Sequence, residues 1–329
     1  MMMSLRVMAC VLGAALAAPA VVADVEVEQK TKIEMPGVLG GVYKMFGGKS
    51  AREGMTSRTV VQGDRKLTVT GDDGELVDLG DEKIYNIDFK KKTYAVMTFD
   101  EWRQKMREQM DAMKEQRGKE PQPDQPEWEV DFDIKDTGQK QAINGFDTHE
   151  VLMTATVHPK GQTAQEGGGG VLRSSLWLGP KIAAMKEIED FDMRFVKAMK
   201  LEELIGGREA MMALANSPAL SKAMEEFRKK KVDMSGTAVR TELKFDAVAP
   251  PGEAAQEAEG EQEEGGLGGM LRGLGKKLGK KKGEEPAGGK GAGPGSQSLM
   301  TSTTEILRVS TEVAANATAL PAGFRQVDR

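Results

Sequence analysis

The feature that most constrains the fold is a two-residue alternation of apolar and charged side chains over residues 128–135. Trp128, Val130, Phe132 and Ile134 alternate there with three acids and a lysine. Successive side chains of a strand point to opposite faces of its sheet, so this pattern predicts a strand with one buried and one solvated face. The same alternation recurs over residues 151–157 and 239–247.

Shorter segments rich in β-branched and apolar residues surround these three strands. Compact Gly-, Asp- and Asn-containing segments separate many of them and are typical of tight turns. Short strands joined by polar turns are typical of antiparallel sheets. The further strands are predicted at residues 31–34, 58–62, 66–70, 76–79, 84–89, 93–97, 171–178 and about 300–313, with turns at 63–64, 71–74, 136–138 and 144–145.

Two helical regions interrupt the strands. Thr98 and Glu101 form a capping-box pattern, and the helix that follows places Phe99, Trp102, Met106, Met110 and Met113 on one stripe and ends near residue 118. Pro180 suits the first helical position of an insertion over residues 180–231. The first helix of this insertion has an apolar stripe that comprises Ile182, Met185, Ile188, Phe191, Phe195 and Met199. Two further helices, over 208–215 and 217–231, are expected to follow it.

The N-terminus has the pattern of a cleavable secretory signal peptide. Arg6 precedes an apolar run from Val7 to Ala20, and small residues at 21–23 allow cleavage after Ala23. The run is shorter than the roughly 20 residues of a transmembrane helix. We therefore expect residues 1–23 to be removed and residues 24–329 to form a single periplasmic or secreted domain; an uncleaved anchor is the alternative.

Charge and cysteine content narrow the function classes. Cleavage removes Arg6 and no acid, so the formal charge changes from −5 to −6, which argues against general nucleic-acid binding. The single cysteine, Cys10, lies in the predicted signal peptide, so the mature chain has neither disulfides nor thiol chemistry.

No catalytic or metal-binding motif is found. The two histidines, His149 and His158, have no triad or metal-ligand spacing. Glu129, Asp131 and Asp133 share one strand face and could bind Ca²⁺, but a solvated face explains them more simply. We therefore expect a protein that is not an enzyme and uses no cofactor or metal.

A Gly-, Pro-, Glu- and Lys-rich segment over residues 250–297 is predicted to be a disordered loop inside the domain. Part of it, residues 265–282, has a basic amphipathic pattern that can lie on an anionic membrane. A solvated loop is the alternative, because its many glycines disfavour a helix. The residues that would contact a membrane are Leu267, Leu271, Leu274, Lys276, Lys277 and Leu278.

Several short segments resemble a family of exported bacterial proteins that is similar in fold to the periplasmic lipoprotein carrier (the LolA-like fold). These segments are 61–66, 84–97, the helix beginning at Phe99, 137–138, 143–146, 236–241 and 320–324. The resemblance implies an α+β fold in which a curved antiparallel sheet, an unclosed half-barrel, has helices packed on its concave face. It also implies an apolar cavity between them and no catalytic residue.

These observations predict a non-catalytic binding protein that shelters a lipid, an acyl chain or a lipidated protein. The alternative is an envelope-associated interaction protein with a filled core and a basic membrane-contacting loop. For each predicted cavity residue, a place in a dry core is the other interpretation. The predicted cavity residues are Trp102, Met106, Met110, Trp128, Phe132 and Trp177.

Overall fold

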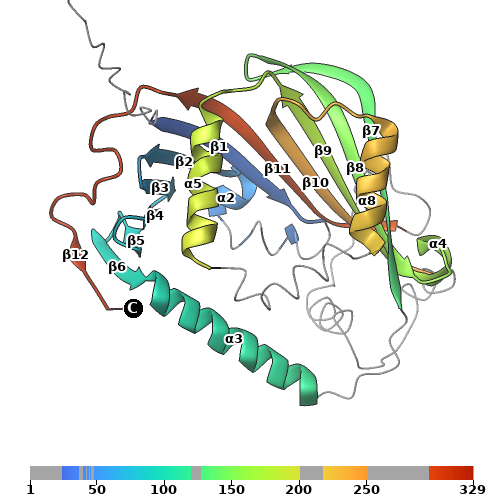
Figure 1. The fold of residues 1–329 in the computed structure, drawn as a ribbon, viewed down its shortest axis with the longest axis horizontal. Helices are drawn as coiled ribbons and strands as arrows, with labels where there is room; N and C mark the ends of the chain where they lie inside the picture. The colour runs from blue at the N-terminus through green and yellow to red at the C-terminus, as the bar shows by residue number, and fades with distance from the viewer. Residues whose placement is uncertain are drawn as a thin grey trace, which may run out of the picture.

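The structure, a computed structural model, describes residues 24–36, 40–41, 43, 45, 48–119, 127–200, 218–250 and 296–328 (Figure 1). The expected signal peptide, the helix expected over 208–215 and nearly all of the loop expected over 250–297 lie outside these residues. Five helices are given bounds: α2 (Gly48–Glu53), α3 (Phe99–Lys119), α4 (Ala164–Gly167), α5 (Met185–Ala198) and α8 (Pro218–Lys230).

Among the described residues, twelve strands form one sheet in the order β12-β6-β5-β4-β3-β2-β1-β11-β10-β9-β8-β7. Neighbouring strands are antiparallel, except that β12 runs parallel to β6. The sheet does not close into a barrel, since β12 and β7 are its two edges. The strands are β1 (Val25–Glu34), β2 (Met55–Gln62), β3 (Arg65–Thr70), β4 (Asp73–Asp78), β5 (Lys83–Asp88), β6 (Thr93–Thr98), β7 (Trp128–Ile143), β8 (Phe146–Pro159), β9 (Gly169–Gly179), β10 (Thr237–Val248), β11 (Ser296–Ser310) and β12 (Arg325–Gln326).

The strands expected from the sequence are confirmed, with corrections at their ends. β1 begins at Val25, before the predicted start at residue 31, and β11 covers 296–310 in place of 300–313. The helix expected to open at Pro180 begins at Met185. In β11, pairing with β10 extends the strand over the polar residues 296–298, which have little strand propensity. In β1, the added residues alternate the buried Val25 and Val27 with polar side chains and pair with β2 and β11.

The two turns that flank the strongest alternation have different outcomes. Asn144 and Gly145 form the expected two-residue hairpin turn, with φ angles of 50° and 85° that this turn type requires. The turn expected at 136–138 is wrong. These residues lie inside β7, where the register shifts between Asp136 and Lys140 and Gly138 takes a φ of 73°, so the segment is a bulge.

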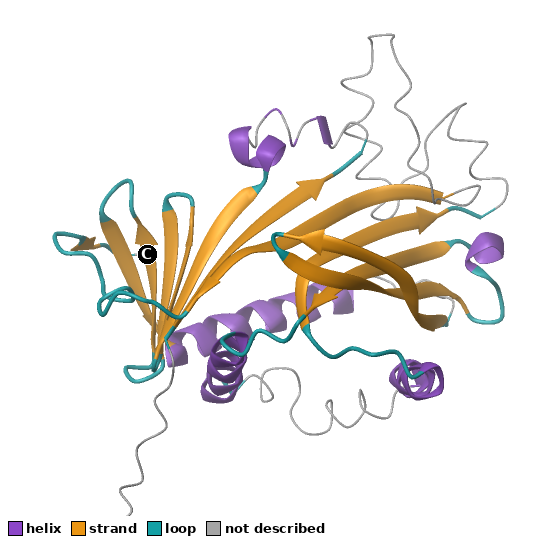
Figure 2. Ribbon diagram, turned by 90° about the horizontal axis from the view of Figure 1, so that it is seen from above, coloured by secondary structure: helices purple, strands orange, loops and turns teal. Residues whose placement is uncertain are grey.

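The sheet has two faces that the register defines, because cross-strand partners share a face and successive residues alternate. We call the face that bears Val27, Ile306 and Ile134 the helix face, and the other the opposite face. Figure 2 shows α3, α5 and α8 on one side of the sheet and α2 on the other.

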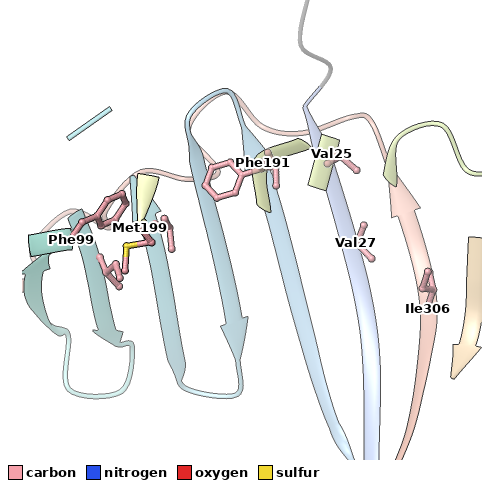
Figure 3. Close-up of a cluster of buried hydrophobic side chains, with 9 residues drawn as sticks. Val25, Val27, Phe99, Phe191, Met199 and Ile306 are labelled. Carbon is pink, nitrogen blue, oxygen red and sulfur yellow. The ribbon is translucent and has the colours of Figure 1, made fainter. Parts of the chain in front are cut away.

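The largest core cluster lies on the helix face beneath α5. Phe191 and Met199 from the α5 region and Phe99 from the start of α3 are fully buried in this cluster, together with Val25 and Val27 of β1. Figure 3 shows Phe99 and Met199 side by side at one end of the cluster and the two valines at the other. The α5 stripe predicted from the sequence is confirmed at residues 185, 188, 191, 195 and 199, which all belong to this cluster.

An arginine joins α3 to the C-terminal end of α5. Arg103 is 7% exposed, and its Nη1 donates a 3.1 Å hydrogen bond to the Ala198 carbonyl. A cation near the last carbonyls of a helix is stabilising, because these groups have no partner within the helix. Arg103 also pairs with Asp100 on its own helix.

The opposite face of β3–β6 is covered by the C-terminal segment. Leu320 and Phe324 pack against Leu76 and Tyr85, and the Phe324 and Phe89 rings meet edge to face at 5.7 Å. Gln62 Oε1 accepts hydrogen bonds from the backbone and hydroxyl of Thr318, both at 3.1 Å. This half of the sheet is therefore packed on both faces.

Candidate functional site

The other half of the sheet, β7–β11, has a different helix on the helix face. α8 packs on β7, where Ile134, Val151 and Leu178 form a small buried cluster with Phe227 at its margin. The Phe132 and Phe227 rings are stacked with centroids 5.7 Å apart. α8 and α5 leave the strands between them bare of described helices in Figure 1.

Charged residues of β7 also hold α8. Asp133 pairs with Lys230, and Asp131 lies 3.8 Å from Lys222. Two of the three strand acids that could have bound Ca²⁺, Asp131 and Asp133, thus have lysine partners. Within the described part of the chain, no three His, Cys, Asp or Glu side chains are placed to hold a metal ion.

His158, one of the two histidines, contacts the same acidic strand face. Its side chain is 8% exposed; one ring nitrogen lies 3.1 Å from the Pro159 carbonyl and the other 2.9 Å from Asp131 Oδ2. Both partners only accept hydrogen bonds, so they favour the doubly protonated ring. The Pro159 carbonyl and then the Asp131 carboxylate raise the pKa of His158.

Between α5 and α8, the helix face presents a continuous apolar row. Each member is the direct cross-strand partner of the next, on strands β7, β8, β9, β10 and β11. The last three members are 43%, 39% and 37% exposed, in row order. We call this set the apolar row; it comprises Phe132, Ala155, Leu172, Phe245 and Met300.

The opposite face of the same strands presents a charged pocket of about 270 Å³. Its side chains come from β8, β9 and β10 at alternating positions, as the wet face of each strand requires. We call it the charged pocket; it is lined by Glu150, Leu152, Arg173, Ser175, Trp177, Arg240, Glu242 and Lys244.

The structure does not bring the six predicted cavity residues into one site. Phe132 belongs to the apolar row, and Trp128 lies on the same face of β7 with 52% of its surface exposed. Trp177 is on the opposite face, because it pairs with Glu150, the neighbour of the buried Val151. A common cavity for Phe132 and Trp177 is therefore wrong.

The three cavity residues expected on α3 lie elsewhere. Trp102 packs at the margin of the α5 cluster, and Met106 and Met110 are half-buried further along the helix. Sequence reasoning missed Leu172, Phe245 and Met300. The alternation over 239–247 could have marked Phe245, but not its neighbours in space.

The six leucines and lysines expected to contact a membrane, between residues 267 and 278, lie outside the described residues. Of the helices that are described, none combines the length and the apolar character needed to cross a bilayer. Comparison with protein-family models and with curated proteins finds no match for the chain. The class that the fold itself defines is an open, mostly antiparallel sheet with helices on its faces.

Proposed function

We propose that this chain is an exported, non-catalytic binding protein that shelters an acyl chain, of a lipid or a lipidated protein, along the apolar row. The observation that carries the proposal is the exposure of Leu172, Phe245 and Met300, side by side in the middle of a large sheet. Soluble proteins bury such contiguous apolar surface unless it serves binding.

The dimensions of the row support an elongated apolar ligand. Five adjacent strands at about 4.8 Å spacing give a row about 19 Å long. Each methylene group that a ligand buries there contributes about 0.8 kcal/mol. A chain of ten buried methylenes would gain about 8 kcal/mol before the entropic cost of ordering it.

We further propose that the row is the floor of a concave half-barrel, with α3, α5 and α8 on the concave side. The bend of the long strands in Figure 2 supports this arrangement, and so does the position of α5 and α8 on either side of the row. An unclosed sheet must cover its concave apolar face, and a helix or a ligand can do so.

The contrast in exposure favours binding over a filled core. Under α5, the cluster members Val25, Phe191 and Met199 are 0% exposed, whereas the three exposed members of the row retain more than a third of their surface. A core filled throughout would leave no such difference.

Binding of palmitate to the purified, delipidated chain tests the proposal. Native mass spectrometry of the protein as isolated should reveal bound lipid, and calorimetric titration should give saturable binding. Leu172→Ser and Phe245→Ser should each weaken palmitate binding about tenfold, because each removes about 1.5 kcal/mol or more of apolar contact.

The matched control is Met193→Ser, which changes an apolar side chain that is 74% exposed on α5, away from the row. It should leave palmitate binding unchanged. Absence of co-purified lipid together with absence of palmitate binding would overturn the proposal, as would an equal loss in the Met193 variant.

A further inference from the structure

The charged pocket is separate from the apolar row, because the two lie on opposite faces of the same strands. Its volume of about 270 Å³ is at or below the lower end for small-molecule sites. It is therefore sized for a ligand much smaller than an acyl chain. Its side chains are distributed in two oppositely charged groups along β9 and β10.

The first group is anionic. Glu150 accepts hydrogen bonds from the hydroxyls of Thr137, at 2.7 Å, and of Ser175. Glu242 is the cross-strand partner of Ser175. Within the part of the chain that the structure describes, neither carboxylate has an ion-pair partner, so two negative charges face the pocket on either side of Ser175.

The second group is cationic. Lys244 lies two residues from Glu242 on β10, and Arg173 lies two residues on β9 from Ser175, whose hydroxyl binds the Glu150 carboxylate. Arg173 and Lys244 are cross-strand partners, and both are directed at Asp246, which is 0% exposed. Lys244 Nζ lies 3.7 Å from Asp246 Oδ1, and that oxygen has no hydrogen bond within the described residues. Two cations thus share one carboxylate, which leaves one positive charge in excess at this end.

The fifth charged side chain of the pocket, Arg240, does not change this separation into an anionic and a cationic end. Arg240 donates to Glu305 at 2.6 Å, so its charge is balanced outside the pocket. Trp177 and Leu152 supply the apolar wall beside the anionic group. An aromatic face next to carboxylates favours an organic ammonium group.

We infer that the charged pocket binds a small zwitterion, with its ammonium group between Glu150 and Glu242 and its carboxylate at Arg173 and Lys244. Two residues of strand separate the two groups by about 7 Å. The amino and carboxyl ends of an extended dipeptide are separated by about the same distance. The end groups of a dipeptide are therefore the chemistry that this spacing fits.

Three related compounds test the inference by titration calorimetry on the full chain at low salt: dialanine, dialanine amide and N-acetyl-dialanine. The amide lacks the carboxylate, and the acetylated form lacks the ammonium group. Dialanine should bind about tenfold more tightly than either, because a charge-assisted hydrogen bond contributes about 1.5–3 kcal/mol.

Two variants test which side chains bind the ammonium end of dialanine and which bind its carboxylate end. The Glu242→Gln variant should bind dialanine and N-acetyl-dialanine with equal affinity, but it should still bind dialanine more tightly than dialanine amide. The Lys244→Met variant should bind dialanine and dialanine amide with equal affinity, but it should still bind dialanine more tightly than N-acetyl-dialanine. The matched controls are Glu28→Gln and Lys30→Met on the opposite face of β1, which should leave all three affinities unchanged.

Three outcomes would overturn the inference. If dialanine fails to bind at millimolar concentration, the pocket is not a site for this zwitterion. Equal binding of dialanine and N-acetyl-dialanine makes the pocket an anion site, and equal binding of dialanine and its amide makes it a cation site. Palmitate binding is measured on the other face, so failure here leaves the acyl-chain proposal standing.

Discussion

The two halves of the sheet differ in what covers them. β3–β6 are packed on both faces, by α3 and α5 on the helix face and by the C-terminal segment on the other. β7–β11 have α8 along one margin, an exposed apolar row in the middle of the helix face and a charged pocket on the opposite face. We therefore expect the first half to supply most of the stability, and the second half to supply the surface for the proposed binding.

This division has a physical basis. Side chains that are fully buried contribute transfer and packing energy, whereas exposed apolar side chains contribute little until a ligand covers them. The half that is proposed to bind a ligand is also the half whose core is less complete. The predictions below test this contrast, and they run from the largest expected change in stability to the smallest.

Phe191→Ala should cause the largest loss. The ring is 0% exposed in the α5 cluster, and the charged ends of Lys66 and Arg194 each lie 5.5 Å from its centroid. Removing it leaves a cavity in the packed half and should lower the free energy of unfolding by about 4 kcal/mol in urea titration. A loss below about 1 kcal/mol would contradict the assignment of this half as the stable one.

Arg103→Met should cost about 2 kcal/mol. The substitution keeps an unbranched apolar stem but leaves the Ala198 carbonyl at the end of α5 without its partner. Urea titration gives the loss, and Arg107→Met, on an exposed position of the same helix, is the control. Equal stabilities of the two variants would show that Arg103 does not hold α3 to α5.

Phe227→Ala should cost less than Phe191→Ala, about 1–2 kcal/mol, because Phe227 is only half-buried. It removes the stack with Phe132 and should release α8 from β7. Hydrogen exchange should therefore accelerate in α8 while the amides of β2–β5 keep their protection. Equal acceleration in both halves would show that they unfold as one unit.

The smallest effect is expected from His158, and it depends on pH. The folded-state pKa lies above the unfolded value of about 6.5, so the charged ring stabilises the fold fully below that pH. The stabilisation is lost as the pH rises through the raised pKa. The stability difference between the wild-type chain and His158→Gln should thus be larger at pH 5.5 than at pH 9. A difference that stays constant with pH would exclude a role for the protonated ring.

Most strands could be predicted because their signal is local. The alternation at 128–134 and the Asn144-Gly145 turn each lie within a few residues, and the structure confirms both. Where an element depends on a distant partner, the prediction failed. The bulge after Asp136 replaced a turn because β8 continues to pair with β7 on both sides of it.

The candidate sites were harder to predict than the fold. Phe132 was identified because its own strand alternates, but the row that contains it joins residues from 132 to 300 in the chain. Trp177 was predicted to line the same cavity as Phe132. Only the register with β8 places it on the other face, among charged residues.

Sequence alone determined the alternation of the strands at 128–135, 151–157 and 239–247, the stripe of α5 and the tight turns at 63–64 and 144–145. These features depend on side chains that are close together in the chain. Tertiary structure decided which strands are neighbours, where the bulges fall and so which face each side chain reaches. The reason is that a shift of one residue in register moves a whole strand's side chains to the other face.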